Sequence, residues 1–186
     1  SGENLSAGHV LGRTLVSPTV GAAAALGTNT GNSTVTGVSA GTGVQRGTYR
    51  IAMVEPGTNL GTFQVFDPSG RLIGDGVVGT GFTGEINFTI NDGATDFVAG
   101  DAFTIAVTGG TYKVKEYDPA DTDGGQRPYG VLLSAVNAAA ADKGGVAIVR
   151  DAEVRSGDLT WFTGATATQK ETAQDVLAAA GLIVRA

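Results

Sequence analysis

Residues 146–154 read Val-Ala-Ile-Val-Arg-Asp-Ala-Glu-Val, a run of β-branched and small residues that predicts an extended segment. Two further apolar segments flank it, Tyr-Gly-Val-Leu-Leu at 129–133 and Leu-Thr-Trp-Phe at 159–162. Short apolar segments separated by turn residues are typical of a mainly β chain. The one segment with helical periodicity follows at residues 167–180.

This helix has sequence signals at both of its ends. Thr168 and Glu171 have the spacing of a capping box, and Gly181 offers a left-handed stop. We expect residues 182–184 to add a closing strand, and the helix to cover the open side of a small β-barrel. Its predicted apolar stripe consists of Ala173, Val176, Leu177 and Ala180.

The middle of the chain predicts a separate all-β module at residues 27–109. Turn signals recur about every 8–12 residues there, which is the spacing of a β-sandwich or small barrel. Before it, an apolar segment at residues 9–16 is expected to end at Pro18, and residues 41–47 are interpreted as a flexible connector. The expected strands of the module are 33–38 (weak), 48–53, 62–67, 76–79, 86–90 and 102–108.

Composition excludes several classes of partner. The chain has 186 residues, a formal net charge of −6 and a pI near 4.6, which argues against nucleic acid as the main partner. It has no cysteine, so thiolate chemistry and disulfides are excluded. No apolar run approaches the roughly 18 residues of a membrane span.

The sequence offers little for catalysis or metal binding. His9 is the only histidine, and no Gly-x-Ser-x-Gly motif is present. Asp118, Asp121 and Asp123 fail the spacing of a calcium loop and are interpreted as a solvated turn. Glu55 and Glu85 form at best a weak candidate for a glycosidase pair. We therefore expect no enzyme, no catalytic residue, no metal and no cofactor.

The order of the C-terminal segments, together with Asn4–Arg13, resembles the head decoration proteins of lambda-like tailed phages. One departure is Phe162, where family members often have proline after the tryptophan. The resemblance implies a discontinuous, barrel-like decoration domain with one C-terminal helix, at residues 1–26 and 110–186. Residues 27–109 would then be an inserted, sandwich-like all-β domain that projects from the capsid.

The resemblance also implies a function and a partner. Such a protein binds the expanded phage head as homotrimers at local threefold axes, contacts the major capsid protein and stabilises the shell. It is made in the host cytoplasm and ends on the outer surface of the virion, without nucleic acid or membrane as a partner.

The resemblance further implies that an N-terminal arm docks on the capsid. Because the chain starts at Ser1 rather than Met, we expect part of this arm to lie upstream. Trp161 has two interpretations, core packing against the helix or an anchor at a subunit contact. The arm corresponds to Ser1, Gly2, Glu3, Asn4, Leu5 and Ser6.

A second function is compatible with the first. The inserted module could be an adhesion domain on the virion surface that binds host glycans or proteins. The low aromatic content, 6%, argues against strong sugar stacking but not against weak multivalent binding.

Overall fold

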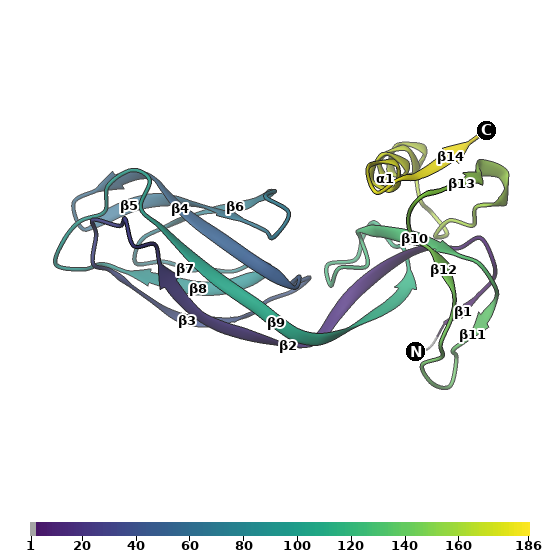
Figure 1. The fold of residues 1–186 in the computed structure, drawn as a ribbon, viewed down its shortest axis with the longest axis horizontal. Coiled ribbons are helices and arrows are strands. Elements are labelled where there is room, and N and C mark those ends of the chain that lie inside the picture. Colours follow the sequence, from purple (N-terminus) through teal and green to yellow (C-terminus); the bar gives the residue numbers. More distant parts are fainter. Residues whose placement is uncertain (1–2) are drawn as a thin grey trace. The chain divides into compact units, whose positions relative to one another are not determined.

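Residues 3–186 are described by a computed structural model, and they are mainly β with one α-helix near the C-terminus (Figure 1). The predicted fold class is confirmed. The chain divides into two compact units: unit 1 comprises the residues up to Thr14 together with Tyr112–Ala186, and unit 2 comprises Leu15–Thr111. These boundaries differ from the predicted ones at 26/27 and 109/110. Strands β2 (Val10–Ala25) and β9 (Ala102–Glu116) contribute residues to both units.

Unit 2 is built from two sheets with a shared core. In the larger sheet the order is β2-β9-β4-β5-β6, and in the smaller one it is β3-β8-β7. The alternating burial of β8 (Ile86–Asn91) shows the predicted period of two, with Ile86, Phe88 and Ile90 in the core. The remaining strands are β3 (Thr34–Ala40), β4 (Gly47–Gly57), β5 (Leu60–Phe66), β6 (Leu72–Val77) and β7 (Gly81–Phe82).

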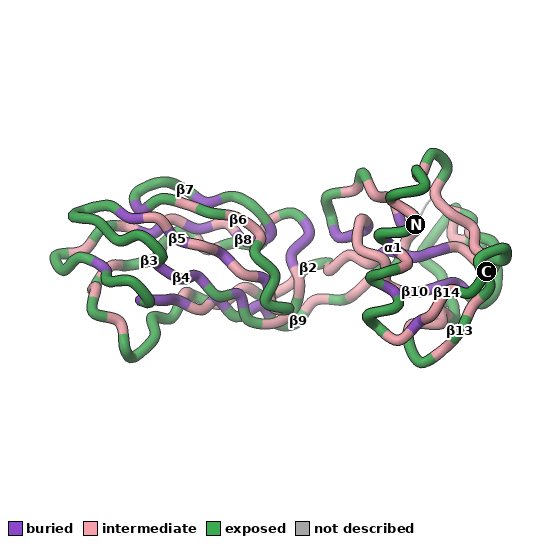
Figure 2. The backbone as a smooth tube through the Cα atoms, turned by 90° about the horizontal axis from the view of Figure 1, so that it is seen from above, coloured by how far each residue is buried: buried purple, intermediate pink, exposed green. Residues whose placement is uncertain are grey.

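The core of unit 2 is rich in aromatic and β-branched side chains. Tyr49 and Ile51 of β4 and Phe63 of β5 are fully buried. Figure 2 shows buried stretches, in purple, along the strands of this unit. Phe82 and Phe88 stack with ring centroids 5.2 Å apart. Both sheets therefore bury one face against the other, as in a β-sandwich.

Two strands run further than the sequence predicted. β2 continues through Pro18 to Ala25, and β9 continues past Thr108 to Glu116. The proline is tolerated because the backbone is irregular there: Ser17 has a φ of 52°, and Gly109 and Gly110 have φ values of 61° and 70°. The prediction that Pro18 ends the strand was wrong for this reason.

The predicted flexible connector at residues 41–47 is instead anchored. Val44 is only 6% exposed. The backbone N–H of Gln45 donates to the Tyr49 hydroxyl at 2.8 Å, and Arg46 donates to the carbonyl oxygens of Gly109 and Gly110 at 2.8 and 2.7 Å. Composition alone did not reveal these partners, because two of them lie more than 60 residues away.

Unit 1 packs short strands against the helix. The antiparallel order is β12-β10-β2-β9, β13 pairs in parallel with β14, and β1 pairs with β11. Asp151, with a φ of 52°, divides the 146–154 run into two strands. The elements are β1 (Asn4–Leu5), β10 (Pro128–Leu132), β11 (Val136–Asn137), β12 (Ala147–Ile148), β13 (Ala152–Arg155), η1 (Ser156–Asp158), α1 (Ala167–Ala179) and β14 (Leu182–Arg185).

The helix is confirmed, but its cap is shifted. Thr166, not Thr168, is the N-cap, and its capping-box partner is Gln169 rather than Glu171. The Gly181 stop (φ 85°) and the closing strand β14 are confirmed.

The apolar stripe of α1 is narrower than predicted. Ala173 and Leu177 are buried against Val10, Val131 and Leu182. Val176 is 44% exposed and Ala180 is also exposed, so they are not core positions. Within residues 3–186 no helix has the length and apolar character needed to cross a membrane.

Candidate functional site

The N-terminal segment is held on unit 1 by strand pairing. Ser1 and Gly2 lie outside the described residues. Asn4 and Leu5 form β1, opposite Asn137 and Val136 of β11. The backbone N–H of Ala138 extends this pairing by donating to the Glu3 carbonyl oxygen at 3.0 Å. Asn4 and Leu5 of the predicted arm are therefore part of a small sheet, and Glu3 extends the pairing by one bond.

Side-chain and backbone contacts fix the same segment at two more points. The Glu3 carboxylate accepts a hydrogen bond from the backbone N–H of Glu116 at 3.0 Å. Further along, the N–H of Gly8 donates to the Leu132 carbonyl at 2.8 Å. Together these bonds connect residues 3–8 to β9, β10 and β11. Sequence reasoning missed them because pairing between segments more than 100 residues apart leaves no local signal.

His9 joins the base of this segment to Glu116. Its Nδ1 lies 3.0 Å from the Ser6 hydroxyl and 2.9 Å from the Ser6 carbonyl oxygen, and its Nε2 lies 3.4 Å from a Glu116 carboxylate oxygen. Burial raises the pKa of Glu116; the His9 charge opposes this, while Glu3 and Asp118 add to it.

A serine, a histidine and a glutamate thus lie in series. In one His9 tautomer Nδ1 donates to the Ser6 carbonyl oxygen, and in the other it accepts from the Ser6 hydroxyl. In either tautomer His9 links Ser6 to Glu116, which ties the N-terminal segment to β9.

The other candidate residues are accounted for by local structure. In the turn at residues 118–123, Lys115 Nζ lies 2.7 Å from Asp121 and 3.3 Å from Asp123. No group of three or more His, Cys, Asp or Glu side chains within residues 3–186 is placed to hold a metal ion.

The candidate glycosidase pair is not brought together. Glu85 is buried and accepts from the Tyr49 hydroxyl at 2.9 Å, whereas Glu55 is exposed and accepts from Thr62 at 3.3 Å. Tyr49 and Glu55 are six residues apart on β4, a strand distance of about 20 Å. Two carboxyl groups cleaving one glycosidic bond lie within about 10 Å.

Trp161 packs at the margin of the unit 1 core. Its ring meets that of Tyr117 edge-on, with centroids 6.3 Å apart. It is half-buried and packs against the cluster that contains Val10 and Leu177. The core-packing interpretation is therefore confirmed, and a role as a subunit contact stays a prediction.

The comparison with protein families agrees with the mainly β fold. Residues 1–182 match the family described as bacteriophage lambda head decoration protein D, so the chain belongs to this family. Family membership identifies a bacteriophage structural protein with a role in capsid decoration.

Other comparisons add little. Two crystal structures of FlgL from Xanthomonas campestris (space groups H3 and C2) are similar at 21% and 19% identity, each with a TM-score of 0.39. The matches cover 59% and 58% of this chain, which spans only 34% and 33% of the FlgL chains. No curated protein sequence matches the chain.

Proposed function

We propose that this protein binds the expanded head of a tailed phage as homotrimers at the local threefold axes and stabilises the shell. The major capsid protein is its partner, and the outer surface of the virion is its location. The observation that carries the proposal is the family match over residues 1–182.

The stabilisation follows from binding linkage. A protein that binds the expanded shell better than the unexpanded one lowers the free energy of the expanded state. A single site adds about 2.7 kcal/mol when the free protein is at 100 times its Kd. Many copies that bridge neighbouring capsid subunits add avidity.

The N-terminal segment is the proposed docking element. In the described sheet β1 has a partner on one side only, β11. The Glu3 carbonyl oxygen accepts from Ala138, directly after β11. Because consecutive residues of an antiparallel strand direct their N–H and C=O groups to opposite sides, those of Asn4 point to the open side. These groups can pair with a capsid strand, together with residues Ser1, Gly2, Leu5 and Ser6 and any upstream part of the arm.

The test is co-sedimentation with purified undecorated shells, both expanded and unexpanded, followed by cryo-electron microscopy of the pellet. The expected result is binding to expanded shells alone, with density in threes over the local threefold axes. Failure of the protein to bind shells from its own phage contradicts the proposal.

A further inference from the structure

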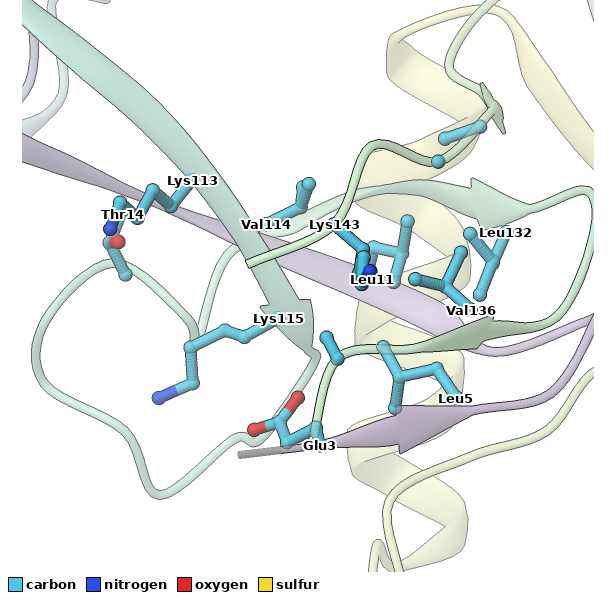
Figure 3. Close-up of a pocket in the computed structure, with 13 residues that line it drawn as sticks. Glu3, Leu5, Leu11, Thr14, Lys113, Val114, Lys115, Leu132, Val136 and Lys143 are labelled. Atoms are coloured by element: carbon cyan, nitrogen blue, oxygen red, sulfur yellow. The ribbon is translucent and has the colours of Figure 1, made fainter. Parts of the chain in front are cut away.

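Unit 1 contains a pocket beside the N-terminal segment, with a volume of about 250 Å³. Figure 3 shows four apolar side chains of its lining near one another: Leu5 of β1, Leu11 of β2, Leu132 of β10 and Val136 of β11. The pocket is therefore assembled from residues 3–14 and 113–147, and the proposed docking segment forms part of its wall.

The pocket lining is part apolar and part charged. Leu11 and Leu132 of the lining are nearly buried, at 2% and 5% exposed, whereas Val114 is 52% exposed and offers apolar surface that a ligand can cover. An apolar cavity of about 150 Å³ is known to hold benzene, so this pocket has room for a bulky apolar side chain. Filling it would remove apolar surface from water, which is favourable in proportion to the area covered.

The pocket also gathers positive charge in an acidic protein. The chain has a formal net charge of −6 and four lysines. Three of them, Lys113, Lys115 and Lys143, line this pocket, and only Lys170 does not. Lysine stems can cover apolar surface while the ammonium group stays in water.

These lysines differ in whether the protein itself neutralises them. Lys113 pairs with Asp142 at 2.5 Å, and Lys115 is paired with aspartates of the 118–123 turn. Lys143 forms no ion pair with any residue in the range 3–186. Glu3, the acid in the lining, has its carboxylate bonded to the backbone N–H of Glu116. Lys143 is thus the ammonium group at the pocket that is open to a carboxylate from outside.

We propose that this pocket receives an apolar side chain next to a carboxylate, supplied by an acidic segment of the capsid protein. The inference rests on the proposed function and deepens it, since it names the chemistry of the capsid segment that unit 1 recognises. The apolar group fills the space over Leu11 and Leu132, and the carboxylate pairs with Lys143. Because Leu5 lies in the wall, the same capsid segment can reach β1.

The first test compares two charge reversals in shell binding. Lys143→Glu should weaken binding to expanded shells at least tenfold, while the matched control Lys170→Glu should bind like the wild type. Raising the salt concentration should reduce the difference in shell affinity between the two variants, because salt screens exposed ion pairs. Equal affinity of the two variants overturns the inference. Absence of binding by the wild-type protein instead overturns the proposed function, so the two failures are distinguishable.

A second test examines the pocket without shells. Hexanoate, which joins an apolar tail to a carboxylate, is titrated into the whole protein and followed by amide chemical shifts. Shifts at Val114, Leu132 and Val136 are expected with hexanoate but not with hexylammonium or acetate. They should disappear in Lys143→Glu and persist in Lys170→Glu. Equal responses to hexanoate and hexylammonium overturn the role of Lys143, and no response to either overturns the pocket as a binding site.

Discussion

Arg71 holds two buried carboxylates in unit 2. Its guanidinium donates to Asp67 at 3.1 Å and to Glu85 at 2.7 Å, although the arginine side chain itself is 55% exposed. Gln45 bridges the same two acids at 3.2 and 3.1 Å, and the Tyr49 hydroxyl completes the network. Since Asp67 and Glu85 are 3% and 9% exposed, the network keeps negative charge inside the sandwich.

Replacing Arg71 should therefore destabilise unit 2. Removing one partner of a fully buried ion pair costs about 3–5 kcal/mol. Because Arg71 is half exposed, we expect Arg71→Ala to lower the free energy of unfolding by about 2 kcal/mol. Urea denaturation followed by circular dichroism measures this. Arg50→Ala, at an exposed position on β4 of the same unit, should change stability by less than about 0.5 kcal/mol. Equal effects of the two substitutions would contradict the role of the network.

Two aspartates make the stability of unit 2 depend on pH. Burial raises the pKa of Asp67, but hydrogen bonds from Ser69 and Arg71 and the Arg71 charge outweigh it, so the pKa lies below 3.8. At Asp101, burial is likewise outweighed by the backbone N–H groups of Gly31, Thr30 and Val98. A lowered pKa gives stability that is complete above 3.8 and is lost as pH falls through the folded-state value.

We therefore expect unfolding of residues 15–111 to need less urea at pH 3 than at pH 6. Carbon-detected NMR titration should place the pKa values of both aspartate carboxyl groups below their ordinary range. Unchanged stability of unit 2 between pH 6 and pH 3 would contradict this prediction.

Glu116 of unit 1 has the opposite shift, a raised pKa. Its contribution to the stability of unit 1 is therefore complete below pH 4.5 and is lost as the pH rises through the raised pKa.

At the start of helix α1 the structure has a different N-cap residue from the one that the sequence predicts, Thr166 instead of Thr168. The Thr166 hydroxyl accepts from the Gln169 N–H at 3.3 Å, and the Gln169 side-chain oxygen accepts from the Thr166 N–H at 2.8 Å. Thr166→Ala should cost about 1 kcal/mol of unfolding free energy, measured through the fluorescence of Trp161. Thr168→Ala, inside the first turn, is the matched control and should cost less than about 0.5 kcal/mol. A larger loss at Thr168 would restore the sequence-based assignment.

The N-terminal segment allows a test of docking at the level of one element. Removing residues 1–6 deletes β1 and leaves the unit 1 core of Val10, Tyr117 and Leu177 in place. We expect binding to expanded shells to weaken at least tenfold, while the urea midpoint of Trp161 fluorescence moves little. Full shell binding by the shortened protein would show that other residues dock.

Strands and helix ends were predictable from the sequence where a single local pattern, such as alternation or a glycine, determines them. Alternation located β4, β5 and β8, and Gly181 located the end of α1. Pro18 was misleading, because its effect depends on whether the partner strand needs an N–H at that point. The cap was misplaced because Thr166 and Thr168 both precede a residue that can complete a capping box.

At the scale of the whole molecule, unit 2 is expected to be an insertion into unit 1. Its two ends are close together, since Leu15 and Val16 lie against Gly110. Joining Thr14 to Tyr112 through a short Gly-Ser linker should therefore leave unit 1 folded and able to bind shells. Circular dichroism, Trp161 fluorescence and co-sedimentation check this. A shortened chain that is unfolded would contradict the proposed discontinuous decoration domain.

The same shortened chain tests the adhesion alternative. Phage decorated with it should adsorb to host cells or mucin as well as phage decorated with the full protein, if unit 2 has no adhesive role. Reduced adsorption with unchanged shell binding would support adhesion through unit 2. Unit 2 alone, residues 15–111, is the matching competitor in this assay.

The candidate site was less predictable than the fold. The family resemblance indicated Glu3, Asn4, Leu5 and Ser6, but not that Glu3 bonds to Glu116 or that β1 pairs with β11. The pocket depends on residues 3–14 and 113–147, and no local pattern records which of them meet. Long-range pairing is a property of the folded molecule, whereas alternation and capping are properties of short segments.

The shared strands β2 and β9 also set the order in which the protein can fold. Pairing Val10 with Val131 in unit 1 closes a chain loop of more than 100 residues, at an entropic cost of about 4 kcal/mol. Once residues 15–111 have folded, Leu15 and Gly110 are neighbours and most of that loop no longer has to be closed. We therefore expect unit 2 to fold before unit 1, so that refolding of Trp161 lags behind the appearance of β structure.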